Sequence, residues 1–356
     1  MKTNTVVDFF LGSHSPQGFR GYFDALDAQP DLWLYLIKAG PGCGKSTMMK
    51  RLASAADGIT ERIHCSSDPD SLDGVIFSSP RAAVLDATAP HTLDPAFPGA
   101  KESVVSLYHT LDAKQLRACA GQIRALFGQC GCHQAAAGRS IVSAGMLLTE
   151  QRAIAARCVD SEKLRGYATR LAARCFPRTG RTGREQIRLL SAVTPQGVLV
   201  WRDTVSALCD QITVFQDEYG AAAFPLLAIL RQAALDSGYE VYSCVCPLSA
   251  GGEVQHLLVP ERGMAFVTSN RWHPMEYPGQ KTVRCSRFWD ANRLRCHKNR
   301  LLLCRKTVDG LLEQASASLR QAKACHDELE TYYVDAADFA AVDKVCAGLA
   351  AELGLA

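Results

Sequence analysis

The sequence of 356 residues has no apolar run of about 18 residues, the length that a membrane-spanning helix requires. Charge of neither sign dominates it, because 39 Lys and Arg against 36 Asp and Glu leave a net charge of +3. Such a balance does not by itself indicate a nucleic-acid or anionic membrane partner. The apolar patch near the N-terminus is short and broken by Asp8, which makes it a poor secretory signal. We therefore expect a cytoplasmic protein without a membrane partner.

Cysteine spacing of the kind that binds zinc is missing as well. The 15 cysteines include two close clusters, Cys130-Gly131-Cys132-His133 and Cys244-Val245-Cys246, but not two matched CxxC-like pairs. An odd number of cysteines scattered over a chain of this size favours reduced thiols. We expect most of them to pack as small buried apolar side chains.

The sequence does contain an internal repeat. The segment SPQG at 15–18 returns as TPQG at 194–197, and further matches follow in the same order along both halves. The apolar runs 32–38 and 211–216 correspond, as do 82–90 and 264–270 and the dipeptides Val159-Asp160 and Val334-Asp335. The pattern predicts two homologous lobes, 1–183 and 184–356, joined by a loop that contains Pro and Gly.

Each half alternates strand-like and helix-like segments. This order is typical of an α/β fold in which helices flank a mainly parallel sheet. The segments 101–175 and 286–350 are rich in Ala, Leu, Arg and Glu, which favours helices. We expect each of these segments to form a helical hairpin appended to its own lobe.

A phosphate-binding loop is the strongest motif. An apolar strand ending at Lys38 leads into AGPGCGKS at 39–46, which fits the Walker A pattern with Ala in place of its first Gly. The glycines allow the backbone N–H groups to curl toward phosphate oxygens, and the start of the next helix adds its positive dipole end. We expect Lys45 to contact the β- and γ-phosphates and Ser46 to bind Mg²⁺. The predicted binding residues for ATP or another nucleoside triphosphate are Gly40, Pro41, Gly42, Cys43, Gly44, Lys45, Ser46 and Thr47.

Carboxylates for the metal and for catalysis follow two strand-like runs. Asp86 ends the run 82–85 in the manner of a Walker B aspartate, the second predicted Mg²⁺ ligand beside Ser46, although such a residue can also cap a turn. Asp68, Asp70 and Asp73 lie close together after the run 61–64. Asp68 or Asp70 could orient a water molecule, and in a kinase Asp68 or Asp73 could hold an acceptor hydroxyl. Alternatively, these aspartates cap a helix that starts near Ser71. The predicted catalytic residues are Lys45, Asp86, Asp68 and Asp70, and His91 and Asp94 could line the same cleft.

The second half has lost this chemistry. In register with the first half, Lys45 falls opposite Ala223, Ser46 opposite Phe224 and Asp86 opposite Thr268. Asp217 and Glu218 add negative charge where phosphates would lie. We therefore predict a degenerate nucleotide site and a lobe that serves as scaffold or regulator.

The chain resembles a bacterial family of tandem P-loop ATPase-like proteins. The resemblance depends on FFLGSHSPQGF, IKAGPGCGKSTMMK, HCSSDPDSLDGV and VLDATAPHTLDPAFPGA in the first half, and on SAVTPQG, LLVPERGMAFVTSN and KACHDELETYYVDAADF in the second. It implies two homologous P-loop NTPase-like lobes, often with a nucleotide motif in each. It names no substrate.

Three functions remain open from the sequence. The first is ATP binding with Mg²⁺-dependent hydrolysis in the first lobe, with Arg20, Arg81 or Arg271 as a candidate arginine finger. The second is a small-molecule or nucleotide kinase with 101–175 as its lid. The third is a nucleotide-dependent nucleic-acid-binding module, favoured by the arginine-rich stretch 165–188. An unknown substrate or protein partner is compatible with each.

Overall fold

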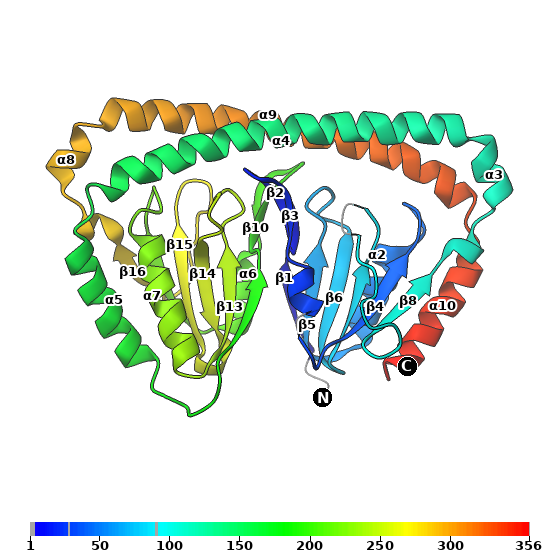
Figure 1. Cartoon of the computed structure of the whole chain (residues 1–356), viewed down its shortest axis with the longest axis horizontal. Helices are drawn as coiled ribbons and strands as arrows, with labels where there is room; N and C mark the ends of the chain where they lie inside the picture. The colour runs from blue at the N-terminus through cyan, green and yellow to red at the C-terminus, as the bar shows by residue number, and fades with distance from the viewer. Residues whose placement is uncertain (1–3, 28, 90–91, 356) are drawn as a thin grey trace.

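The computed structural model describes residues 4–27, 29–89 and 92–355, so that His91 lies outside the described residues. It shows an α/β protein with two six-stranded mixed sheets side by side, each flanked by helices (Figure 1). The expected α/β class is confirmed. The short helices η1 (Tyr108–Thr110), η2 (Pro260–Arg262) and η3 (Cys285–Phe288) lie in connections.

The first sheet has the strand order β1-β5-β6-β7-β4-β8. Its strands are β1 (Asn4–Phe9), β4 (Trp33–Lys38), β5 (Asp57–His64), β6 (Leu72–Ser79), β7 (Ala82–Asp86) and β8 (Glu102–Ser106). β1 pairs with β5, and β4 with β7 and β8, in parallel, whereas β6 is antiparallel to both of its neighbours. The sheet is therefore mixed but mostly parallel.

The second sheet repeats this arrangement strand for strand. Its order β9-β13-β14-β15-β12-β16 is built from β9 (Arg184–Arg188), β12 (Gln211–Gln216), β13 (Glu240–Val245), β14 (Val254–Val259), β15 (Met264–Ser269) and β16 (Lys281–Arg284). β14 is the antiparallel strand here, as β6 is in the first sheet. The helices α1 (Asp24–Asp27) and α2 (Lys45–Ala55) of the first half correspond to α6 (Arg202–Leu208) and α7 (Ala223–Asp236).

The repeated PQG sequence forms the same turn twice. It joins β2 (Gly12–Ser15) to β3 (Gly18–Gly21), and again β10 (Ser191–Thr194) to β11 (Gly197–Val200). The Ser15 hydroxyl donates to the Gly18 carbonyl at 2.8 Å, and the Thr194 hydroxyl donates to the Gly197 carbonyl at 2.9 Å. Both glycines have a positive φ, 98° and 106°, which explains why glycine stands at this position in each copy.

The prediction of a helical hairpin on each lobe is wrong. After the short helices α3 (Ala113–Ala118) and α8 (Ala291–Arg295), each half forms one long helix, α4 (Ala120–Ala156) or α9 (Lys298–Asp335). These two helices lie antiparallel across the same end of both sheets (Figure 1). Local propensity predicts helix in both segments, 101–175 and 286–350. Because α4 and α9 pack against each other, neither segment folds back on itself as a hairpin.

The long helices carry the last helix of each half to the opposite sheet. α5 (Ser161–Cys175) packs Leu164 and Leu171 into the core around α7, and α10 (Phe339–Glu352) packs Val342 and Cys346 into the core around α2. The two halves have therefore exchanged their terminal helices within one chain.

The two sheets also share one core. Val7, Leu36 and Leu85 of the first sheet belong to the same buried cluster as Val214 and Val267 of the second. The backbones of Phe10 and Leu189 exchange two hydrogen bonds of 2.9 Å. The halves therefore depend on each other for burial of their apolar surface.

A buried ion pair crosses this shared core. Arg188 and Glu61 are 1% and 6% exposed, and their Nε and Oε2 atoms lie 2.6 Å apart. The Tyr242 hydroxyl donates to the same carboxylate at 3.0 Å. Replacing only one partner would leave the other charge buried without compensation.

We expect Glu61→Leu to lower the free energy of unfolding by about 3–5 kcal/mol, measured by urea denaturation. The double variant Glu61→Leu with Arg188→Met should recover most of this loss because it removes both charges. Equal instability of the single and double variants would contradict this account.

The cysteines behave as the sequence indicates. None of the 15 forms a disulfide, and most are buried. Burial raises the pKa of Cys209 to about 12, so its thiol stays protonated at neutral pH. In the part of the chain that the structure describes, no helix combines the length and apolar character needed to cross a bilayer.

Candidate functional site

The glycine-rich loop joins β4 to α2 at the carboxyl ends of the parallel strands β4, β7 and β8. In α/β sheets this edge is where ligands bind. Gly42 and Gly44 have φ values of 66° and 78°, so the loop curls through backbone conformations that favour glycine. Gly44 directly precedes α2, and the loop therefore leads into the positive end of that helix dipole.

Lys45 and Asp86 meet beside this loop. The Lys45 Nζ lies 3.2 Å from an Asp86 carboxylate oxygen and donates to the Gly40 carbonyl at 2.9 Å. Both side chains are largely buried, with 12% and 14% exposed. The Thr88 backbone N–H donates to the other Asp86 oxygen at 3.0 Å and fixes that carboxylate at the end of β7. The structure thus brings the two most important predicted site residues together.

Ser46 connects the loop to the start of β6. Its hydroxyl oxygen accepts a hydrogen bond of 3.0 Å from the Leu72 backbone N–H. Within the loop, Cys43 is buried, while Thr47 is exposed on α2. The hydroxyl of Ser46 keeps a lone pair that could coordinate a metal ion.

The aspartates before β6 have a different role from the one expected in the capping alternative. A strand begins at Leu72, so no helix starts near Ser71 and that alternative is wrong. The run 72–77 is buried throughout and rich in Val, Ile and Phe, which favours a strand.

Asp68 accepts from the Ser71 hydroxyl at 2.7 Å and lies 3.6 Å from the Lys323 ammonium group on α9. The Asp70 side chain is exposed. Within the described part of the chain, the hydrogen bonds and ion pairs of Asp68 and Asp70 do not reach Lys45 or Asp86.

The C-terminal end of α9 covers the loop. A Glu330 carboxylate oxygen accepts from the Gly42 backbone N–H at 3.1 Å. The Tyr333 ring lies so close to Gly40 that a Cβ there would stand 2.5 Å from its Cδ1 atom. One N–H of the loop is thus bound to a carboxylate that comes from the second half of the chain. Neither residue can be predicted from the sequence, since no local signal places 330–333 against 40–42.

His326, Asp327 and Glu330 form a small cluster on this part of α9. One ligand atom from each lies within 4.8 Å of the others. Asp327, however, is paired with Lys323 at 2.8 Å, and Glu330 binds the Gly42 N–H. Asp327 and Glu330 are therefore already engaged within the protein rather than free to bind a metal ion.

The matching loop in the second half is filled by its own carboxylate. Asp217 is 1% exposed and accepts from the backbone N–H groups of Ala222 and Ala223, both at 2.7 Å. A third hydrogen bond of 3.2 Å comes from the Tyr219 N–H. Burial raises the pKa of Asp217, while these backbone hydrogen bonds act in the opposite direction. Asp217 thus occupies the N–H groups at the start of α7 that an external phosphate would need.

The candidate arginine fingers all have partners elsewhere. Arg81 lies before β7, at the opposite edge of the sheet from the loop, and pairs with Asp31. Arg271 pairs with Asp309 at 3.0 Å, and the Arg20 guanidinium lies 5.1 Å from the centre of the Tyr22 ring. These contacts place none of the three on the glycine-rich loop.

The arginine-rich stretch 165–188 does not form a single basic face. Arg165, Arg170 and Arg174 are on α5, but Arg188 is buried against Glu61. Arg181 pairs with Glu261, and Arg184 with Asp31. Much of the positive charge in this stretch is therefore compensated within the fold.

No family model, curated protein or solved structure matches this chain.

Proposed function

We propose that the first half of the chain binds Mg-ATP, or another nucleoside triphosphate, at 40–47 and hydrolyses it. The observation that supports this most strongly is Lys45 beside Asp86, behind a loop curled by Gly42 and Gly44 ahead of α2. This set supplies the backbone donors, the ammonium group and the carboxylate that phosphoryl transfer requires. The second half, whose loop is filled by Asp217, acts as a scaffold or regulator.

The groups of this site have distinct parts in the proposed reaction. Lys45 turns from Asp86 and the Gly40 carbonyl toward the β- and γ-phosphates, where its charge stabilises the transition state. Ser46 and Asp86 would hold Mg²⁺, which offsets phosphate charge. Asp68 remains the better placed candidate for orienting water, because Ser71 and Lys323 hold its carboxylate while Asp70 is exposed.

The strand order of the two sheets supports membership of the tandem P-loop ATPase-like family. Two sheets with matching strand order are what two homologous P-loop NTPase-like lobes would form. The structure gives less support to the alternatives. The segment 101–175, expected as a kinase lid, contains the long helix α4, which packs on α9, and several arginines of the basic stretch are paired internally.

Asp86→Asn tests this function. We expect it to slow phosphate release from Mg-ATP roughly 100-fold or more, because an amide cannot offset the charge of the metal ion. Asp203→Asn is the matched control, since Asp203 is exposed on α6 of the second half and its replacement should leave the rate unchanged. Hydrolysis at an equal rate in Asp86→Asn would contradict the proposal, as would a purified chain that releases no phosphate.

A further inference from the structure

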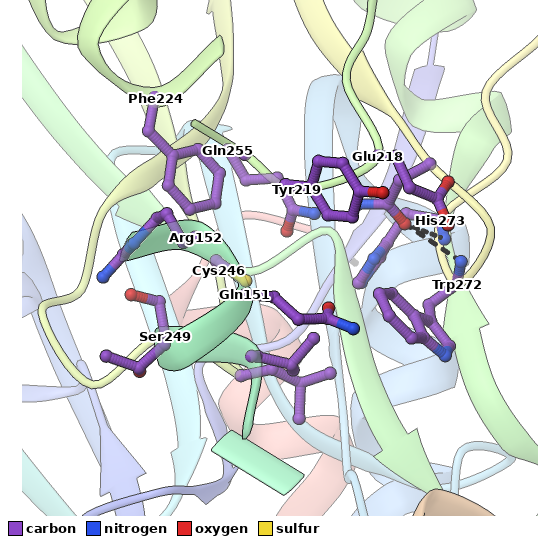
Figure 2. Close-up of a pocket in the computed structure, with 15 residues that line it drawn as sticks. Gln151, Arg152, Glu218, Tyr219, Phe224, Cys246, Ser249, Gln255, Trp272 and His273 are labelled. Carbon is purple, nitrogen blue, oxygen red and sulfur yellow. Dashed lines mark hydrogen bonds between the residues drawn. The ribbon is translucent and has the colours of Figure 1, made fainter. Parts of the chain in front are cut away.

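A cavity lies in the second half, at the place that corresponds to the nucleotide loop of the first half (Figure 2). Its walls are the loops that follow β12, β13 and β15, and the stretch 148–152 of α4 closes it. The cavity itself is small, about 50 Å³, but Thr149, Arg152 and Phe224 also line an adjoining hollow of about 430 Å³. The hollow has the size of a small-molecule site, and a ligand held there can reach into the cavity.

Two deeply buried polar side chains line this cavity without satisfying their hydrogen-bonding groups. Gln255 is 1% exposed, and its Oε1 has no partner among the described residues. His273 is 2% exposed and contacts the Ser191 hydroxyl through Nε2 at 2.8 Å, whereas its Nδ1 has no partner among them. A buried polar group costs about 1–3 kcal/mol unless water or a ligand supplies its partner. Both belong to the wall of the cavity, where a ligand could satisfy them (Figure 2).

Aromatic rings form much of the remaining wall. Tyr219, Phe224 and Trp272 line the cavity from two different loops and the start of α7 (Figure 2). The Trp272 indole N–H is already bound to Asp309 at 2.9 Å, which fixes the ring. Rings held in this way favour a flat aromatic ligand over an aliphatic one.

The charges around the cavity are already compensated. Arg152 pairs with Glu253, and its guanidinium lies 5.5 Å from the centre of the Phe224 ring. Burial raises the pKa of Glu218, while Arg271 and Arg305 lower it. Asp217 fills the N–H groups that could hold a phosphate. Arg152 is the one arginine or lysine among the described residues that line the cavity, and because it is already paired, an anionic ligand would meet no free cation in the cavity wall.

We propose that this cavity binds a small uncharged heteroaromatic molecule of the nucleobase or nucleoside class, without phosphate. The ligand stacks among Tyr219, Phe224 and Trp272 and hydrogen-bonds to Gln255 and His273. This site is separate from 40–47 and does not depend on nucleotide hydrolysis there. It gives the second half a ligand of its own, at an edge of the sheet that has lost its phosphate chemistry.

The test uses the full chain with adenine and adenosine as probes, followed by ligand-detected saturation-transfer NMR and titration calorimetry. We expect at least one probe to bind, and Gln255→Leu to weaken binding at least tenfold because it removes the acceptor while keeping the side-chain volume. Phe224→Ala, at a half-buried position, should also weaken binding and provides a second variant should Gln255→Leu fail to fold. Gln211→Leu is the exposed control and should bind like the unmodified chain.

Lys45→Ala separates this proposal from the nucleotide site of the first half. Binding of the probe should survive that change. The proposal is overturned if neither probe binds the folded chain, if both cavity variants bind undiminished, or if Lys45→Ala alone removes binding.

Discussion

Lys45→Ala is expected to weaken Mg-ATP binding roughly 100-fold or more while the chain stays folded. The physical reason is that Lys45 is the ammonium group placed at the loop, 3.2 Å from Asp86, and hydrogen bonds to charged groups contribute about 1.5–3 kcal/mol each. Two such bonds to the β- and γ-phosphates account for a loss of this size. Titration calorimetry with Mg-ATP measures it, and circular dichroism checks the fold.

Lys50→Ala provides the matched control for this prediction. Lys50 is exposed on the same helix, and its Nζ donates to the Asp70 carbonyl rather than to the loop. Its replacement should leave affinity for Mg-ATP within about twofold, since exposed charges of this kind contribute little. Equal affinities of the Lys45 and Lys50 variants would show that the loop is not the nucleotide site.

Glu330→Ala is expected to act in the opposite direction and raise affinity for Mg-ATP roughly tenfold. In the structure its carboxylate accepts from the Gly42 N–H and puts negative charge beside the loop. A nucleotide must displace this group before that N–H can bind a phosphate oxygen. Removing the competitor frees the donor and relieves repulsion of the phosphates.

Glu328→Ala is the control for this second prediction, because Glu328 is exposed on the same helix two residues away. It should not change the affinity. If Glu330→Ala instead weakens binding, the carboxylate assists the bound nucleotide or its metal ion, and the idea that it competes with phosphate is wrong.

Helix α9 connects the two halves through the hydrogen bond between Glu330 and the Gly42 N–H. Glu330 and Tyr333 belong to the second half in sequence but lie on the loop of the first. By the same exchange, Gln151 and Arg152 of the first half lie at the cavity of the second. Each site is therefore completed by a helix from the other half, and movement of the α4–α9 pair would affect both.

The local parts of the site could be predicted from the sequence. The loop around Gly42 and Gly44 is specified by adjacent residues, since a strand, a glycine-rich turn and a helix follow one another directly. Asp86 was identified for the same reason, because it ends a short apolar strand. The internal repeat predicted two similar α/β halves, and the matching strand orders agree with it.

Contacts between distant segments could not be predicted. The helical composition of 120–156 was visible, but only packing against α9 determines that it crosses to the other sheet. The sequence also allows a helix where β6 forms, because this short apolar run gives no clear period.

The second half shows the same limit. The sequence indicated that Asp217 would oppose phosphate, yet only the fold shows its carboxylate accepting from Ala222 and Ala223. The cavity beside it joins Gln255, His273 and Tyr219 from separate strands and loops. No spacing in the sequence brings these residues together.

A crystal structure of the full chain with Mg²⁺ and a non-hydrolysable ATP analogue tests the central claim most directly. We predict triphosphate density at 40–47 of the first half only, with Lys45 on the phosphates and Glu330 withdrawn from the Gly42 N–H. An empty loop at saturating nucleotide, or a triphosphate bound at the start of α7 in place of the Asp217 carboxylate, would contradict it.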